Sequence, residues 1–160
     1  MILFGALIGA LGFRLRGSAL FEQWTGRGAT TARVVCWAIP IAILSLVNVP
    51  ILYAPLIGLA IFLGAIPGWY GSLDLGRDDG HVAKDYVIMT VRGFVWTAPA
   101  AYIMSMFSIE SAVALVIAGL MCPLAYTAGW YIPSKVNHAR QGPEVGELIF
   151  GALVGMAVMV

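Results

Sequence analysis

The distribution of apolar residues constrains the fold of this chain more than any single motif does. Six apolar segments alternate with short or polar connections. With 61% hydrophobic and 11% charged residues, the chain carries more apolar surface than one soluble core of this size needs. We therefore expect an all-α integral membrane protein, with residues 1–160 forming one domain. Its six transmembrane helices are expected at about 1–13, 31–47, 51–70, from Asp78 or Asp79 to 107, 111–131 and 145–160.

The positions of the charges predict an orientation. Every lysine and arginine lies in the first, third or fifth connection, or in the first turns of the helix that follows it. Because positive loops stay on the cytoplasmic side, we predict a multi-pass protein of the inner (plasma) membrane with cytoplasmic charged loops and both termini outside. The first and last segments are short for a span of about 20 residues. Either other subunits shield them or they lie where the bilayer is thin.

Small residues recur at spacings of three and four, which lets helices approach closely in lipid. They are Gly5, Gly9 and Gly12, then Gly64, Gly68 and Ser72, then Gly151 and Gly155. This pattern favours tight helix packing and a homo-oligomer in the lipid bilayer. No basic tail or stripe indicates a nucleic-acid partner. Cys36 and Cys122 lie in apolar runs, where we expect free thiols.

An internal repeat is indicated by two short motifs. Arg33, Trp37 and Pro40 match Arg92, Trp96 and Pro99 at an offset of 59 residues, as R-x-x-x-W-x-x-P. Gly68-Trp69-Tyr70 matches 129–131 at an offset of 61 residues. Similar offsets favour three related helical hairpins, at about 1–48, 50–107 and 111–160. Chance is the competing explanation, because glycines and aromatic residues are common at membrane interfaces.

The stretch from Gly71 to Arg92 contains seven of the 17 charged residues, and ionisable groups are costly wherever lipid replaces water. His81, Asp85 and Arg92 follow one another at i, i+4 and i+11, which places them roughly along one helix face. Arg92 needs an acidic partner, for which Asp85 and Glu147 are the candidates. Trp37 and Trp96, each four residues after an arginine, can supply a cation–π contact.

These four residues, His81, Asp85, Arg92 and Glu147, have two interpretations. An ion-pair network that only fixes helix packing is one. A polar pathway is the other, because intramembrane ionisable residues often mark substrate or ion routes. On the second interpretation, the expected function is a small channel or transporter with a charged vestibule on its cytoplasmic side.

Two further classes remain open. A membrane enzyme acting on a phosphate-bearing lipid headgroup would need oxygen ligands and an anion clamp, and only this class would need Mg²⁺. The weak metal candidates are Asp74, Asp78, Asp79 and His81, and the anion-binding candidates are Arg14, Arg16 and Arg77. No phosphate-loop, metalloprotease or nucleophile-elbow motif supports an enzyme. A phage holin-like or structural assembly protein is the third class, although six spans would be many for a holin.

Overall fold

The computed structural model describes residues 1–16, 26–70, 82–128 and 142–160, and this part of the chain contains seven helices and no strand. The all-helical class is therefore confirmed for the described residues. The helices are α1 (Ile2–Arg16), α2 (Gly26–Ser45), α3 (Ala54–Tyr70), α4 (Val82–Met104), α5 (Ile109–Leu120), an unlabelled helix (Cys122–Ala128) and α7 (Gly142–Val158).

The fifth predicted helix, 111–131, is wrong as a single straight element. Helix α5 ends at Leu120, and the axis of Cys122–Ala128 is tilted from it by 53°. Pro123 explains the break, because it has no backbone N–H and its ring crowds the carbonyl of Gly119, four residues earlier. Two rigid segments therefore replace the one that the apolar run predicted.

The prolines within the other helices do not interrupt them. Pro40 and Pro99 lie inside α2 and α4, and both helices continue through them. Pro55 is the second residue of α3. Proline fits the first turn of a helix, where its missing N–H would have no partner within the helix in any case.

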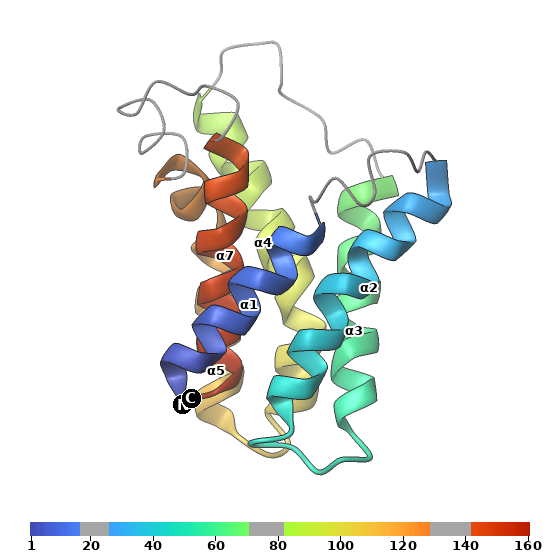
Figure 1. Cartoon of the computed structure of the whole chain (residues 1–160). Coiled ribbons are helices and arrows are strands. Elements are labelled where there is room, and N and C mark those ends of the chain that lie inside the picture. The colour runs from blue at the N-terminus through green and yellow to red at the C-terminus, as the bar shows by residue number, and fades with distance from the viewer. Residues whose placement is uncertain (17–25, 71–81, 129–141) are drawn as a thin grey trace.

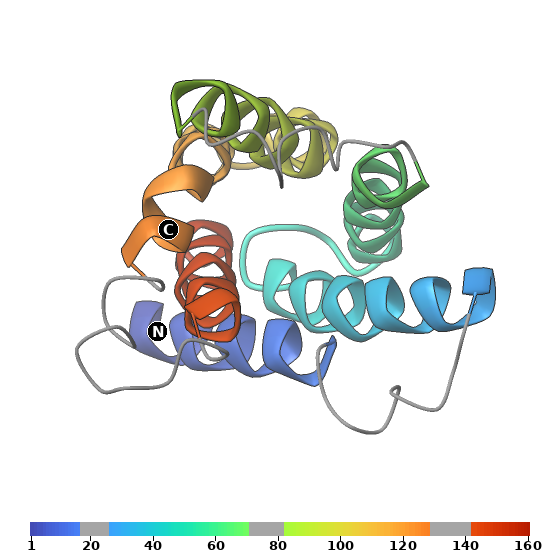
Figure 2. The same ribbon diagram turned by 90° about the horizontal axis from the view of Figure 1, so that it is seen from above.

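The helices form a closed ring when seen along the bundle axis (Figure 2). Each one packs on the next in chain order, from α1 through α2, α3, α4 and α5 to α7, and α7 then packs on α1. The contact between α1 and α7 is the most extensive of these. The first and last helices thus complete the ring, and the N- and C-termini lie at the same end of it (Figure 1).

The two ends of the ring differ in charge. Helices α1 and α3 end, and α2, α4 and α7 begin, at one end, which we call the charged end (Figure 1). The charged residues of the described helices lie in the half of their helix nearer this end: Arg14, Arg16, Arg27, Arg33, Lys84, Asp85, Arg92, Glu144 and Glu147. Glu110, at the start of α5, is the exception within the described helices. The other end holds both termini and the short turns after α2 and α4.

The outer surface of the ring is apolar. Leucine, isoleucine, valine and phenylalanine side chains on α1 to α5 are exposed, among them Leu3 (84%), Ile43 (60%) and Val87 (64%). The polar exceptions among exposed described residues are Ser105, Glu110 and Thr127, together with the two tyrosines 53 and 102. Apolar surface of this extent is typical of a face that contacts membrane or another protein.

Helix length gives a weaker signal for membrane spans. Within the described residues, Tyr86–Met104 is long and apolar enough to cross a membrane, and the bent pair of α5 and Cys122–Ala128 adds a second span if it is counted as one. The other apolar helical segments have 10–17 residues.

Glycines bring α1 and α7 into backbone contact. A Cβ atom added to Gly9 would lie 2.9 Å from the Cα atom of Gly155, and one added to Gly155 would lie 2.8 Å from the carbonyl carbon of Gly5. Real Cβ atoms do not approach backbone so closely. The predicted packing role of these glycines is therefore confirmed, and their partners are each other.

A polar cluster joins three elements at the end that holds the termini. The Nδ2 atom of Asn48, in the turn after α2, donates to Oγ of Ser111 and to the carbonyl of Val158, both at 3.0 Å. Ser111 is fully buried in the first turn of α5 and also shares a 2.9 Å hydrogen bond with Ser108. One amide thus ties the α2–α3 turn to α5 and to the last turn of α7.

Replacing Asn48 with alanine should lower the free energy of unfolding by about 1–3 kcal/mol, because Ser111 and the Val158 carbonyl would lose their donor. Thermal unfolding in detergent, followed by circular dichroism, measures the loss. Ser105→Ala is the control, since its 2.7 Å hydrogen bond to Tyr102 is local and exposed. Equal losses of stability in the two variants would show that the cluster contributes no more to folding than an exposed local hydrogen bond does.

Candidate functional site

Three aromatic side chains meet at the centre of the ring, one from each of α2, α4 and α7. The ring centroid of Trp96 lies 5.6 Å from those of Trp37 and Phe150, and Trp37 lies 6.3 Å from Phe150. The interplanar angles are 63°, 45° and 57°, so the rings pack edge to face or tilted, as aromatic clusters prefer. All three residues are at most 1% exposed. We call this set the aromatic layer.

The three rings occupy the same position in their helices. Each lies eight residues before the last residue of its helix, which is Ser45, Met104 or Val158. In all three helices the residues one, four and eight positions after the ring are also buried. These positions hold Ala38, Ile41 and Ser45 in α2, Thr97, Ala100 and Met104 in α4, and Gly151, Val154 and Val158 in α7.

Arg92 lies next to the aromatic layer on the side of the charged end. Its guanidinium carbon lies 4.8 Å from the ring centroid of Trp96, so the predicted cation–π contact is confirmed for this pair. The Nε atom of Arg92 and the indole nitrogens of Trp37 and Trp96 are all inaccessible to solvent. The guanidinium therefore stacks on the aromatic layer with its Nε atom covered, while Arg92 as a whole is only partly buried.

Other ionisable residues precede the rings of the aromatic layer at short distances along the chain. Arg33 and Arg92 each precede their tryptophan by four positions, and Glu147 precedes Phe150 by three. Each is therefore about one turn nearer the charged end along its own helix than the ring that follows it. Asp85 lies seven residues before Arg92, about 10 Å farther along α4 toward the charged end.

The remaining predicted site residues are not brought into the described site. His81, Asp74, Arg77, Asp78 and Asp79 lie outside the described residues. The metal site and the anion clamp built on them stay predictions. Within the described residues, no group of His, Cys, Asp or Glu side chains is arranged to hold a metal ion.

Four further candidates lie in helices that the structure describes, but the positions of their side chains are not among the described features. They are Arg14 and Arg16 in the last turn of α1, Asp85 in α4 and Glu147 in α7. The anion-binding role of the first pair therefore stays a prediction, as do the ion pairs of the second. Both cysteines are free thiols, as expected.

Phe150 is the member of the site that the sequence did not reveal. The motif that pairs Trp37 with Trp96 has no third copy in α7, where Gly146 and Leu153 stand in place of the arginine and the proline. The available signal was an aromatic residue three positions after Glu147, in a segment whose other apolar residues are small or aliphatic. That signal is weak unless the positions of Trp37 and Trp96 in their own helices are known.

Comparison of the chain with protein-family models, curated proteins and solved structures gave no match. Function is therefore argued from the geometry of the site and of the surface.

Proposed function

We propose that this protein is a small channel or transporter of the inner membrane. On this proposal its apolar segments are six membrane crossings arranged as three related hairpins. The apolar outer surface of the ring supports the membrane placement, because exposed leucine, isoleucine and valine side chains on α1 to α5 are stable against lipid. The common register of the rings in α2, α4 and α7 supports the three hairpins.

The charged end faces the cytoplasm in this proposal, and both termini lie outside. Charges gathered at one end of the ring support a fixed orientation, since arginine and lysine are retained on the cytoplasmic side. The short helices need not cross the bilayer alone. Helix α7 has no exposed residue among those described from 145 to 159. It is therefore surrounded by the other helices, and its length need not equal the thickness of the bilayer core.

The observation that carries the transport proposal is the position of Arg92 beside the aromatic layer. Its guanidinium carbon lies 4.8 Å from the ring centroid of Trp96, at the centre of the ring of helices. Ionisable residues facing the interior of a membrane bundle are costly and commonly line a pathway. An apolar constriction next to them is a known way to gate one. The aromatic layer, which is fully packed, would be the closed gate.

Flux measurements in liposomes test the proposal. Vesicles containing the purified protein should pass K⁺, Cl⁻ or a small neutral solute such as glycerol faster than empty vesicles. We expect Arg92→Gln to lower the ratio of anion to cation flux, because a guanidinium beside the pathway attracts anions and repels cations. Arg92→Lys keeps the charge and should keep the ratio nearer that of the wild type.

Glu110→Gln is the matched control, since it removes an exposed charge at the opposite end of the ring. It should leave the flux ratio unchanged. A folded wild-type protein that passes none of the three probes faster than empty vesicles would remove the transport proposal.

A further inference from the structure

The turn between α2 and α3, residues 46–53, crosses the ring at the end that holds the termini. Figure 2 shows it reaching from α2 toward α7 on the inner side of the ring. Helices α5 and α7 are not neighbours of α2 or α3 in the order of the ring. Asn48 nevertheless donates to Ser111 of α5 and to the carbonyl of Val158 in α7. These hydrogen bonds therefore bridge the ring, whereas the other contacts between elements mostly follow it.

The bridge lies beyond the aromatic layer, on the inward faces of the helices. Ser45 and Val158 each follow the aromatic ring of their own helix by eight residues, about 12 Å along the helix, and both are fully buried. Val49, next to Asn48, is 4% exposed and packs in the hydrophobic core. The turn thus places one amide and one apolar side chain in the interior of the ring. This end is the outer end in the orientation proposed above.

The two acceptors of the bridge depend on Asn48 for a donor. Val158 is the last residue of α7, so its carbonyl has no partner within the helix. The hydroxyl of Ser111 is fully buried and accepts from the same amide. Buried groups that lose a hydrogen-bond partner are costly unless water replaces it. Movement of Asn48 away from them therefore requires water to enter the end of the ring.

The far side of the turn is fixed on the perimeter. The ring centroid of Tyr53 lies 4.7 Å from that of Phe107, at the end of α4, and α3 and α4 are neighbours in the ring. Between the two attachments, Ile51 and Leu52 are 74% and 81% exposed. The middle of the turn is thus free of packing against the described helices. One attachment can be released while the other holds.

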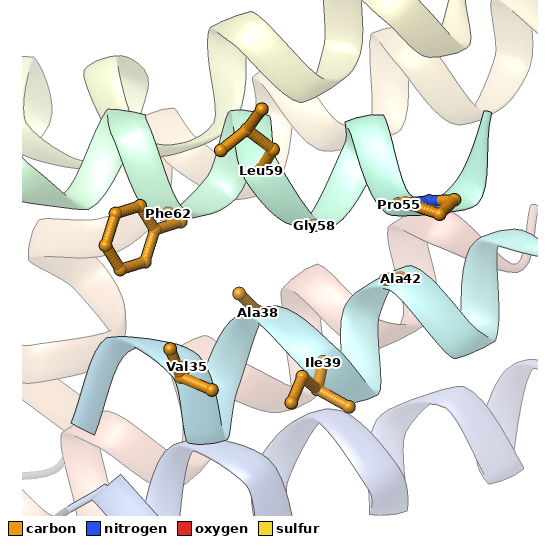
Figure 3. Close-up of a pocket in the computed structure, with 8 residues that line it drawn as sticks. All are labelled: Val35, Ala38, Ile39, Ala42, Pro55, Gly58, Leu59 and Phe62. Carbon is orange, nitrogen blue, oxygen red and sulfur yellow. The ribbon is translucent and has the colours of Figure 1, made fainter. Parts of the chain in front are cut away.

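The grooves on the outer surface do not provide a route along the ring axis. Figure 3 shows the groove between α2 and α3, where Gly58 lies against Ala38 and Ala42. Ile39 and Leu59 along its sides are 53% and 50% exposed, so this groove opens away from the centre of the ring. A pathway on the axis must therefore open by movement of the residues that fill it.

We propose that Asn48 and Val49 form an outer gate of the pathway, in series with the aromatic layer. The gate rests on the transport function proposed above. It is closed in the structure, and it opens when the Asn48 amide leaves Ser111 and Val158 and water takes its place. Two hydrogen bonds from one neutral amide are a modest closure, because each contributes little net free energy in competition with water. The hydroxyls of Ser45 and Ser111 then line a hydrated outer mouth.

The reactivity of a thiol at position 45 tests the gate without a measurement of transport. In a protein with Cys36→Ala and Cys122→Ala, Ser45→Cys should react slowly with a water-soluble methanethiosulfonate in detergent, because position 45 is fully buried. Adding Asn48→Ala should raise the rate about tenfold, as expected for the loss of one or two neutral hydrogen bonds. Adding Ser105→Ala, in the turn after α4, should leave the rate unchanged. Equal rates in the three proteins would overturn the gate.

The native thiol of Cys122 separates opening of the gate from general unfolding. Cys122 is 1% exposed and lies beyond α5, in the helix nearer the charged end. In a protein with Cys36→Ala and no other new thiol, Asn48→Ala should leave the reaction rate of Cys122 unchanged. Equal acceleration at positions 45 and 122 would show that the whole ring loosens, and it would overturn the gate.

A reversible cross-link tests whether the gate controls flux. Asn48→Cys with Ser111→Cys places a thiol at each end of the bridge, and a short bis-methanethiosulfonate can join the two. In the background without native cysteines, the linked protein in liposomes should lose most of the flux of the unlinked protein, and a reductant should restore it. Tyr53→Cys with Phe107→Cys is the matched control, since the same link there joins neighbours on the perimeter. It should leave the flux unchanged.

The outcomes separate the gate from the transport function. Flux that is equal in linked and unlinked Asn48→Cys/Ser111→Cys protein would overturn the gate and leave transport in place. An equal reduction of flux by both cross-links would do the same. If neither the wild type nor any unlinked variant passes solute, the transport function fails and the gate fails with it.

Discussion

Replacing Gly9 with valine should separate α1 from α7 and lower the free energy of unfolding by about 3 kcal/mol. Overpacking in a well-packed core costs about 1–3 kcal/mol. The upper end applies here because a Cβ atom at Gly9 would meet the backbone of Gly151 and Gly155, which no side-chain rotation can move away. The α1–α7 contact is the most extensive in the described ring, so its loss opens the ring.

Leu11→Phe separates this effect from that of added volume. Leu11 is on the same helix but is 49% exposed, and a larger side chain there meets no backbone. Unfolding of both variants in detergent, followed by circular dichroism, should give a large loss for Gly9→Val and almost none for Leu11→Phe. Two variants of equal stability would mean that α1 does not hold the ring closed.

The glycine spacing predicted close packing in α1 and α7 but not that these helices pack on each other. A sequence with small residues every fourth position shows which face of a helix is available for contact. The helix that packs on that face is set by contacts between residues more than 140 positions apart in the chain, such as Gly9 and Gly151. Local spacing contains no information on that pairing.

The repeat motif contains two of the three central aromatic residues, although it did not predict that they meet. Trp37 and Trp96 stand in copies of one motif, whereas Phe150 has buried residues at the same offsets but Gly146 and Leu153 in place of the arginine and the proline. Burial at the same offsets in α2, α4 and α7 is a property of packing, and residues as different as Ala38, Thr97 and Gly151 satisfy it. Sequence identity between the helices is therefore a poor measure of their structural equivalence.

The sequence leaves two candidates, Asp85 and Glu147, as the acidic partner of Arg92. Glu147 precedes Phe150 by three residues in α7, whereas Asp85 precedes Trp96 by eleven in α4. Periodicity along α4 alone cannot distinguish the two, because it carries no information on how α7 packs against α4. The side chains of both acids lie outside the described residues, so their pairing with Arg92 stays a prediction.

Replacing Trp96 with alanine should open the centre of the ring. Trp96 contacts both other rings of the aromatic layer and the guanidinium of Arg92, and it is 1% exposed. Removing a buried tryptophan costs about 3–5 kcal/mol of folding free energy through lost contacts and the remaining cavity. If the layer closes a pathway, the same cavity should raise the flux of small solutes above that of the wild type.

The two effects are separated by a pair of control variants. Trp96→Phe keeps a ring in the layer and should keep the flux near that of the wild type, with a smaller loss of stability. Phe94→Ala removes a ring that is 42% exposed on the outer surface of the same helix, so flux should not change. If Trp96→Ala remains folded, as circular dichroism would show, and its flux equals that of the wild type, the aromatic layer does not close a pathway. In that case the cluster serves only to hold α2, α4 and α7 together.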